Sequence, residues 1–317
     1  MTNATIMWTL FGAVVLVMLL LDLKLFHRKA HEIRLGEAVL WSLIWVALSL
    51  AFALGVSLEL GQDHAMKFLT GYLIEKALSM DNLFVFLIIF SYFGVPLEYQ
   101  HKVLFWGILG ALLFRALFIA AGVALIGMFA WTIYVLGAFL VFTGIKLAFA
   151  SDREFHPERN LGIRLFRKIY PVTTEYSGDH FFTMHNGVRA ATPLFIALIV
   201  IETTDIVFAT DSIPAILGIT TDPFLVYSSN IFAILGLRAL YFVLAGIMRM
   251  FRFLHYGLSL ILVFVGVKML AGEWLHLSVT VELSIVFGIL LGSVLASLVF
   301  KEKKAVSSEE DGTAPPR

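Results

Sequence analysis

The sequence predicts an all-α polytopic membrane protein with about nine transmembrane helices. Of its 317 residues, 60% are hydrophobic and 15% are charged, whereas an ordinary soluble domain has about 25% charged residues. Nine apolar runs have roughly the 20 residues that cross the hydrocarbon core of a bilayer. They lack the alternation of apolar and polar residues that is typical of membrane β-strands, so a helical bundle is predicted.

The predicted helices follow one another along most of the chain. They cover residues 7–26, 38–58, 68–94, 103–126, 131–149, 192–217, 224–248, 253–271 and 279–300. The opening run has neither the basic start nor the small-residue cleavage site of a signal peptide, so we expect it to remain as a helix. Nearly all loops are short, but residues 150–191 form a long one in which we expect amphipathic structure.

Lys and Arg residues are distributed unevenly between the two sides of this bundle. Apart from Lys67, those in the loops and the tail fall on one side. Loops rich in Lys and Arg remain in the cytoplasm. The sequence therefore predicts an N-terminus outside the cell and a cytoplasmic C-terminus.

Two helices share an acidic motif, in which an acidic residue is followed six positions later by Asp and then by a small polar residue. The motif residues are Glu75, Asp81 and Asn82 in the first half, and Asp205, Asp211 and Ser212 in the second. The next helix in each half contains Arg-Ala-Leu and an aromatic residue, starting at Arg115 or Arg238. The third contains Lys146 or Lys268, which follows the arginine by 31 or 30 residues.

These matches predict two inverted three-helix repeats. Because each unit has three helices, the second must enter the membrane from the opposite side, an arrangement typical of secondary transporters. The predicted parts are two N-terminal transmembrane helices (1–60), the first repeat (61–150), a cytoplasmic loop (151–191), the second repeat (192–272), a last transmembrane helix (273–300) and a disordered cytoplasmic tail (301–317).

Eleven ionisable residues lie within the predicted spans. They are Asp22, Glu75, Lys76, Asp81, Arg115, Lys146, Glu202, Asp205, Asp211, Arg238 and Lys268. Left unpaired at helix centres, they would cost on the order of 30 kcal/mol in total, so they must face one another or water. The acids outnumber the bases and gather on the two motif helices, which favours a cation site.

Oxygen-bearing side chains supply the candidate ligands of that site. Carboxylate, amide and hydroxyl oxygens suit a hard divalent ion such as Mn²⁺, Mg²⁺ or Ca²⁺. The candidates are Glu75, Asp81, Asn82, Glu202, Asp205, Asp211 and Ser212. The candidate counter-ion or gating residues are Arg115, Arg238, Lys146 and Lys268, of which the two lysines lie near span ends and can also snorkel to the surface.

The spacing of the acids leaves alternatives open. Six residues turn an α-helix by about 600°, so the two acids of one motif lie about 120° apart. Either the helix is distorted between them, for which Pro214 offers a break in the second half, or Asp81 and Asp211 bind the ion while Glu75 and Asp205 pair with basic residues. A third alternative is that all of these charges form ion pairs that only fix helix packing.

Four segments resemble the signature sequences of the TerC family of integral membrane proteins. They are residues 71–86, 180–187, 191–194 and 202–215. The resemblance extends over about residues 10–300, and the length is closest to that of the Alx-like, alkali-induced bacterial subgroup. It implies an inner-membrane protein of metal homeostasis, chiefly for manganese export, whose functional residues are the membrane acids.

We therefore expect a secondary transporter that exports Mn²⁺ through a carboxylate site near the membrane midplane. Protons are the candidate counter-ion, because carboxylates lose protons when they bind a cation. Mn²⁺ would be the substrate, and no permanently bound cofactor is expected. The alternative is a non-transporting membrane factor that delivers metal or assembles with other proteins of metal or tellurite resistance, with the loop 151–191 as its interaction surface.

Composition argues against several other functions. The 23 basic residues balance the 23 acidic ones, which leaves no net field to attract nucleic acid. The absence of cysteine excludes thiolate metal sites and thiol nucleophiles in this chain, and no nucleophile–base pair stands out, so we do not expect an enzyme. The residues leave open the transport direction, the coupling ion, the oligomeric state and the preference among Mn²⁺, Mg²⁺ and Ca²⁺.

Overall fold

The computed structural model describes residues 3–26, 35–149, 160–185, 187–247, 253–275 and 277–299. Its helices are α1 (Asn3–Phe26), α2 (Leu35–Leu60), α3 (Gln62–Phe93), α4 (Leu97–Met128), α5 (Thr132–Ala148), α6 (Leu161–Ile169), α7 (Pro193–Leu217), α8 (Pro223–Leu235), α9 (Leu237–Ile247), α10 (Leu254–Ala271) and α11 (Val279–Val299). A 3-10 turn (Gly272–Trp274) follows α10, and β1 (Phe182–His185) and β2 (Val188–Ala191) form a hairpin. The predicted disordered tail lies outside the described residues.

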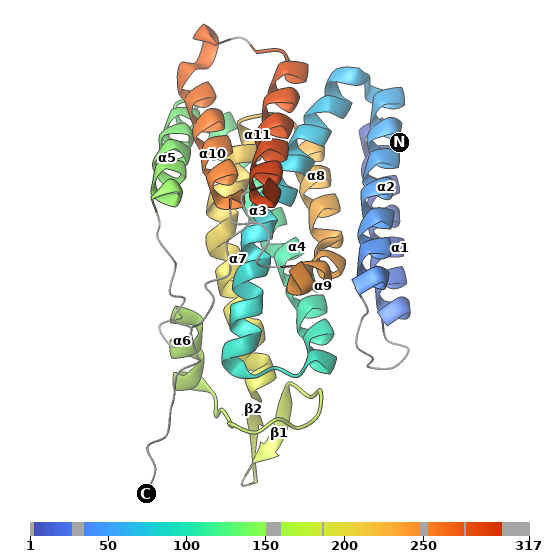
Figure 1. Cartoon of the computed structure of the whole chain (residues 1–317), viewed down its shortest axis with the longest axis vertical. Coiled ribbons are helices and arrows are strands. Elements are labelled where there is room, and N and C mark those ends of the chain that lie inside the picture. Colours follow the sequence, from blue (N-terminus) through green and yellow to red (C-terminus); the bar gives the residue numbers. More distant parts are fainter. Residues whose placement is uncertain are drawn as a thin grey trace, which may run out of the picture.

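A helix, or the pair α8 and α9, occupies each of the nine predicted positions (Figure 1). By length and composition, five of these helices qualify as membrane spans, namely α2, α4, α7, α10 and α11, and the bent pair α8–α9 would be a sixth. Helix α5 is shorter, with 17 residues, and α3 carries charged residues in its middle. The helical membrane architecture is thus confirmed, with the short hairpin as an addition, whereas the expected number of nine spans is not confirmed.

Helix α4 turns apolar residues outward and a charged residue toward the other helices. On α4, Leu113 and Leu117 are 71% and 65% exposed, whereas Arg115 between them is 1% exposed. Soluble proteins place charged side chains at the surface and large apolar ones inside. The outer surface of α4 is therefore suited to hydrocarbon, and the charge is sequestered between helices.

Helix α7 does not break at the predicted position. It continues through Pro214 and ends three residues later at Leu217, so the proline lies in the last turn, where its missing backbone donor does not divide the helix. The break lies instead at Gly236, between α8 and α9, whose axes differ by 42°. Gly236 adopts φ −85° and ψ 0°, and its amide donates to the Ile234 carbonyl, which ends the regular pattern of helical hydrogen bonds.

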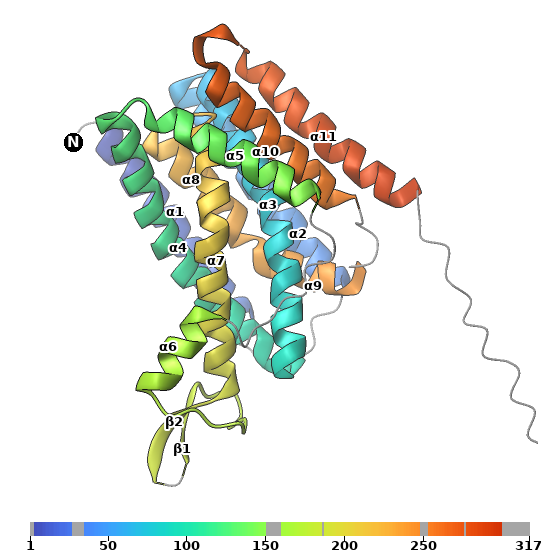
Figure 2. The same cartoon turned by 90° about the vertical axis from the view of Figure 1, so that its left-hand side faces the viewer.

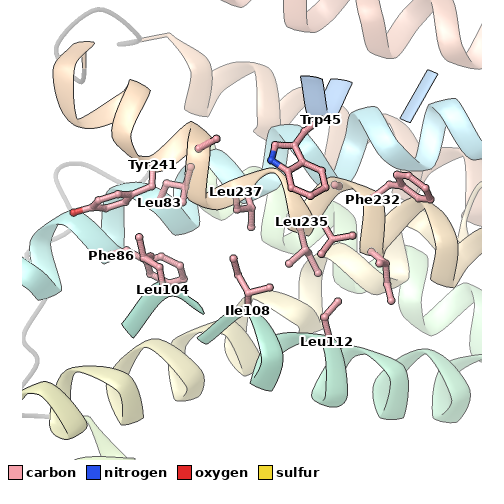
Figure 3. Packing of buried hydrophobic residues seen from close by; sticks show 14 of the residues in the cluster. Trp45, Leu83, Phe86, Leu104, Ile108, Leu112, Phe232, Leu235, Leu237 and Tyr241 are labelled. Carbon is pink, nitrogen blue, oxygen red and sulfur yellow. The ribbon is translucent and has the colours of Figure 1, made fainter. Parts of the chain in front are cut away.

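Apolar side chains from α2, α3, α4 and the broken pair itself surround this break. Figure 3 shows them converging on the junction of α8 and α9. The labelled residues are Trp45 of α2, Leu83 and Phe86 of α3, Leu104, Ile108 and Leu112 of α4, and Phe232, Leu235, Leu237 and Tyr241 of the broken pair. The break is therefore packed on several sides by large side chains, which hold the bend in place.

Helices α5 and α10 pack against each other at backbone distance (Figure 2). A Cβ atom on Gly137 would lie 3.0 Å from the Gly266 carbonyl oxygen, and one on Gly144 would lie 2.9 Å from the Ser259 carbonyl oxygen. The hydroxyl of Ser259 donates to the Gly144 carbonyl at 2.6 Å. Residue numbers rise along α5 as they fall along α10, so the two helices are antiparallel.

The long loop carries helix α6 and the hairpin, which projects from one end of the bundle (Figures 1 and 2). Helix α6 buries Ile163 and exposes Arg164, so it is amphipathic as expected. Lys102 of α4 donates to Asp179 Oδ2 at 2.9 Å, and this hydrogen bond lowers the pKa of the Asp179 carboxyl. Tyr176 donates to the Phe93 carbonyl at 2.8 Å, and burial raises the pKa of its phenol to about 12. The loop is thereby fixed to the ends of α3 and α4.

The close contact of α5 and α10 predicts the effect of one methyl group. In Gly266→Ala, the new Cβ would lie 2.7 Å from the Gly137 carbonyl oxygen, a backbone atom that cannot turn aside. We expect a loss of about 1–3 kcal/mol of stability, measured as a lower melting temperature in detergent. The control is Gly292→Ala on α11, where nothing lies within 4 Å of the added Cβ. Equal melting temperatures of Gly266→Ala and Gly292→Ala would contradict the inferred packing.

Candidate functional site

A buried arginine joins the two motif helices. Arg115 lies near the middle of α4, and its guanidinium binds both oxygens of Asp205 on α7, with Nε–Oδ2 and Nη2–Oδ1 distances of 3.2 and 3.0 Å. Its Nη1 also forms an ion pair with Oε1 of Glu75 on α3. Such a two-pronged contact matches the planar fork of arginine to a carboxylate. The arginine therefore joins one acid from each predicted repeat through ion pairs.

Neutral polar side chains complete this network. Asn230 of α8 accepts from Arg115 Nη1 at 3.3 Å and donates to Glu75 Oε2 at 3.1 Å. Ser79, one turn after Glu75, donates to Glu75 Oε1 at 3.2 Å, and Ser212 Oγ lies 3.3 Å from Arg115 Nη1. Four helices thus meet at one guanidinium, and the motif acids Glu75 and Asp205 pair with a basic residue, as both the second and the third of the alternatives given above require.

A small cavity lies beside the network. Its polar lining consists of Asn82 from α3, Thr143 from α5, and Asp211 and Ser212 from α7. The volume is about 30 Å³, above the roughly 10–15 Å³ that one water molecule requires. The cavity therefore has room for one small ion or water among oxygen-bearing side chains from three helices. Ser212 connects it with Arg115.

The remaining candidate ligands are placed differently. Glu202 lies one turn before Asp205 and packs against Gly110 of α4, where any Cβ atom would collide with the Glu202 carboxylate. Glu202, Glu75 and Asp205 do not line the cavity. The side chain of Asp81 lies outside the described part of the structure. Among the side chains that are described, no three acidic or histidine groups converge as a metal cluster.

The candidate counter-ion residues also separate into different environments. Arg238, in the first turn of α9, is 1% exposed and lines a second cavity of about 20 Å³ together with Asp205 and mostly apolar side chains. Lys268 pairs with Glu282 of α11 at 2.6 Å and donates to the Gly218 carbonyl at the end of α7. Lys146 is exposed in the last turn of α5, which agrees with a snorkelling lysine better than with a gating one.

Sequence reasoning missed the neutral members of the site. Ser79, Thr143 and Asn230 are not among the predicted ligands. Those ligands are acidic residues and the small polar residue that ends each motif. The available signal was the presence of amide and hydroxyl side chains within apolar helices, where polar groups are costly unless they find partners. Gly110 carried no signal, since its role depends on the approach of Glu202.

Comparison with known proteins gives extensive matches. The family model described as "integral membrane protein TerC family" matches residues 60–305. The chain is 50% identical to a membrane protein designated STKORF319 of Myxococcus xanthus over 305 residues, which is 96% of this chain and 95% of that protein. No solved structure matches.

Two further relatives cover similar lengths. Over 295 residues, the chain is 47% identical to a protein of Escherichia coli (strain K12) named Alx and described as a proposed membrane-bound redox modulator, with 90% and 92% of the two chains covered. Over 294 residues, it is 40% identical to a membrane protein of Rickettsia bellii, with coverages of 93% and 97%.

The Arg115 network predicts a strong effect of removing its one cation. Arg115→Met leaves Glu75 and Asp205 buried without their counter-ion, which costs about 3–5 kcal/mol, and we expect a large loss of folded protein on size-exclusion chromatography in detergent. Adding Glu75→Gln and Asp205→Asn removes the stranded charges and recovers part of that loss. Arg164→Met, at an exposed position on α6, is the control. If Arg115→Met gave as much folded protein as wild type, the network would not hold the helices together.

Proposed function

Because the chain belongs to the TerC family of integral membrane proteins, we propose that it is a secondary transporter that exports Mn²⁺ from the cytoplasm of a bacterium across the inner membrane. The observation that supports this proposal best is the cavity lined by Asn82, Thr143, Asp211 and Ser212. It lies between helices of both halves of the chain and next to a network in which other motif acids are already paired with Arg115.

The donor chemistry fits a hard divalent cation. The cavity offers a carboxylate, an amide oxygen and two hydroxyl oxygens, the ligand types that Mn²⁺, Mg²⁺ and Ca²⁺ accept. We assign Asp81, which precedes Asn82 in the first motif, as the second carboxylate of the site. Two carboxylates would balance the two positive charges of the ion, so the ion and these two ligands together would carry no net charge.

The arginine network has a different task in this proposal. Glu75 and Asp205 are both engaged by Arg115, so each has a cationic partner before any ion arrives. They position α3 and α7, whereas Asp81 and Asp211 receive the cation. Protons are the proposed counter-ion, because these carboxylates release protons on metal binding and regain them after release.

Alternating access would use the two inverted repeats. Gly144 and Gly266 are counterparts in the two repeats, because each precedes its motif lysine by two residues. Gly137 and Ser259 are also counterparts, because each precedes its motif lysine by nine residues. Gly137 contacts Gly266, and their counterparts Ser259 and Gly144 contact each other. A two-fold axis produces contacts of this reciprocal kind. We propose such an axis between α5 and α10, with the N-terminus outside and the C-terminus in the cytoplasm.

The name of the Escherichia coli relative concerns redox modulation. This chain has no cysteine and cannot itself hold a thiol–disulfide couple. Under the proposed function, an effect on cellular redox balance would follow indirectly, from the manganese that the protein removes.

The test is uptake of radioactive Mn²⁺ into inside-out vesicles that contain the purified protein, with an imposed pH gradient as the variable. We expect wild type to accumulate Mn²⁺ and Asp211→Asn and Asp81→Asn to lose about tenfold or more of the rate, the loss typical of disturbed metal sites. Thr143→Val removes one neutral oxygen and should lose less. Thr210→Val is the matched control, since Thr210 is exposed on the same helix as Asp211.

Two results would contradict the proposal at different points. A wild-type uptake rate in Asp211→Asn would place the ion elsewhere. No uptake by folded wild-type protein under any gradient would contradict transport itself and favour the metal-delivery or assembly factor, for which the projecting loop between α5 and α7 would be the next target.

A further inference from the structure

Lys76 is a charged residue of the bundle to which the proposed transport gives no role. It follows Glu75 on α3, but its side chain extends to the end of α8, whereas Glu75 contacts Arg115. The ammonium donates to the carbonyl oxygen of Ala233 at 3.1 Å. Ala233 lies in the last turn of α8, three residues before the break at Gly236. The lysine thus contacts the end of a broken helix, whereas Arg115 pairs with carboxylates and Lys268 pairs with a carboxylate in addition to a helix-end carbonyl.

The break explains why this carbonyl can receive a cation. In an uninterrupted α-helix, the Ala233 carbonyl would accept from the amide of Leu237. Here α8 ends at Leu235, and the last carbonyls of a helix lack partners within it. They also form the negative end of the helix dipole. The ammonium therefore supplies both a hydrogen bond and a positive charge where the helix end requires them.

The surrounding residues are shaped to fit the ammonium. Gly236 has no side chain, and a Cβ atom at this position would lie 2.8 Å from Lys76 Nζ. The same Cβ would lie 3.1 Å from Cβ of Trp45, so Trp45 bounds the space next to the ammonium. Figure 3 shows Trp45 beside Leu235 and Leu237, the two residues that flank Gly236. A side chain at position 236 would therefore crowd the ammonium.

We infer that the end of α8 is a cation subsite that the protein fills with the ammonium of Lys76. In transporters with broken helices, the exposed carbonyl ends of half-helices bind monovalent cations such as Na⁺. Lys76 supplies a cation that is covalently tethered and cannot leave. It is therefore a positioning residue that fixes the bend before Arg238, and it makes the bundle independent of a small monovalent cation.

The inference is tested by opening the subsite and measuring which cations stabilise the purified protein. The variant Lys76→Ala removes the ammonium and leaves space. We expect it to melt below wild type in choline chloride and to gain about 3 °C or more when Na⁺, K⁺ or NH₄⁺ replaces choline at the same ionic strength, because a ligand that binds only the folded state raises its melting temperature. The wild-type melting temperature should not distinguish these cations from choline.

Three variants control the experiment. Lys76→Met fills the space without charge, so it should melt below wild type with no gain from small cations, and Lys76→Arg keeps a charge at this position and should show no gain either. Lys67→Ala removes a partly exposed lysine from the same helix and should behave as wild type. If Lys76→Ala yields no folded protein, Lys76→Ser takes its place under the same criteria.

The inference would be overturned if folded Lys76→Ala had the same melting temperature in Na⁺, K⁺, NH₄⁺ and choline. It would also be overturned if small cations raised the melting temperature of Lys76→Met as much as that of Lys76→Ala. The readout is cation-dependent melting, not Mn²⁺ transport. A failure of this inference is therefore distinguishable from a failure of the proposed function.

Discussion

The arrangement of this bundle depends on neutralising one guanidinium inside the membrane. Arg115 is almost fully buried, and its partners come from α3, α7 and α8. A charge at such a depth is costly unless its counter-charges and hydrogen-bond partners are in place. Those partners fix how the three helices face α4. The lipid-facing residues of α4 then need only be apolar, because the packing is set from within.

The same constraint divides the acidic residues between two tasks. The first acid of each motif is engaged by Arg115, while the second part of each motif contributes Asn82, Asp211 and Ser212 to the cavity. The rotation of about 120° between positions six residues apart produces this division. A straight helix thereby presents one acid to a structural network and polar oxygens to a neighbouring space, without the distortion that a single shared site would demand.

Much of the fold could be predicted, because apolar runs and buried charges are visible in one chain. Each predicted span has its helix, and the repeated motifs identified Glu75, Asp205 and Arg115 as interior residues. The break was placed wrongly, at Pro214, since a proline is apparent in sequence while the bend at Gly236 depends on packing from α2, α3 and α4. Asn230 and Thr143 were missed for a related reason: a neutral polar residue becomes informative only when its neighbours in space are known.

The pairing of Glu75 with Arg115 also bears on how the chain enters the membrane. These residues are separated by 40 positions and lie on consecutive helices, whereas Asp205 follows Arg115 by 90. During synthesis, α3 and α4 therefore emerge with one acid and one base that neutralise each other while the second half is still being made. The nascent hairpin can be released into lipid without a net charge from this pair. Asp205 then arrives at an arginine already in position, which gives the second half a fixed point on which to assemble.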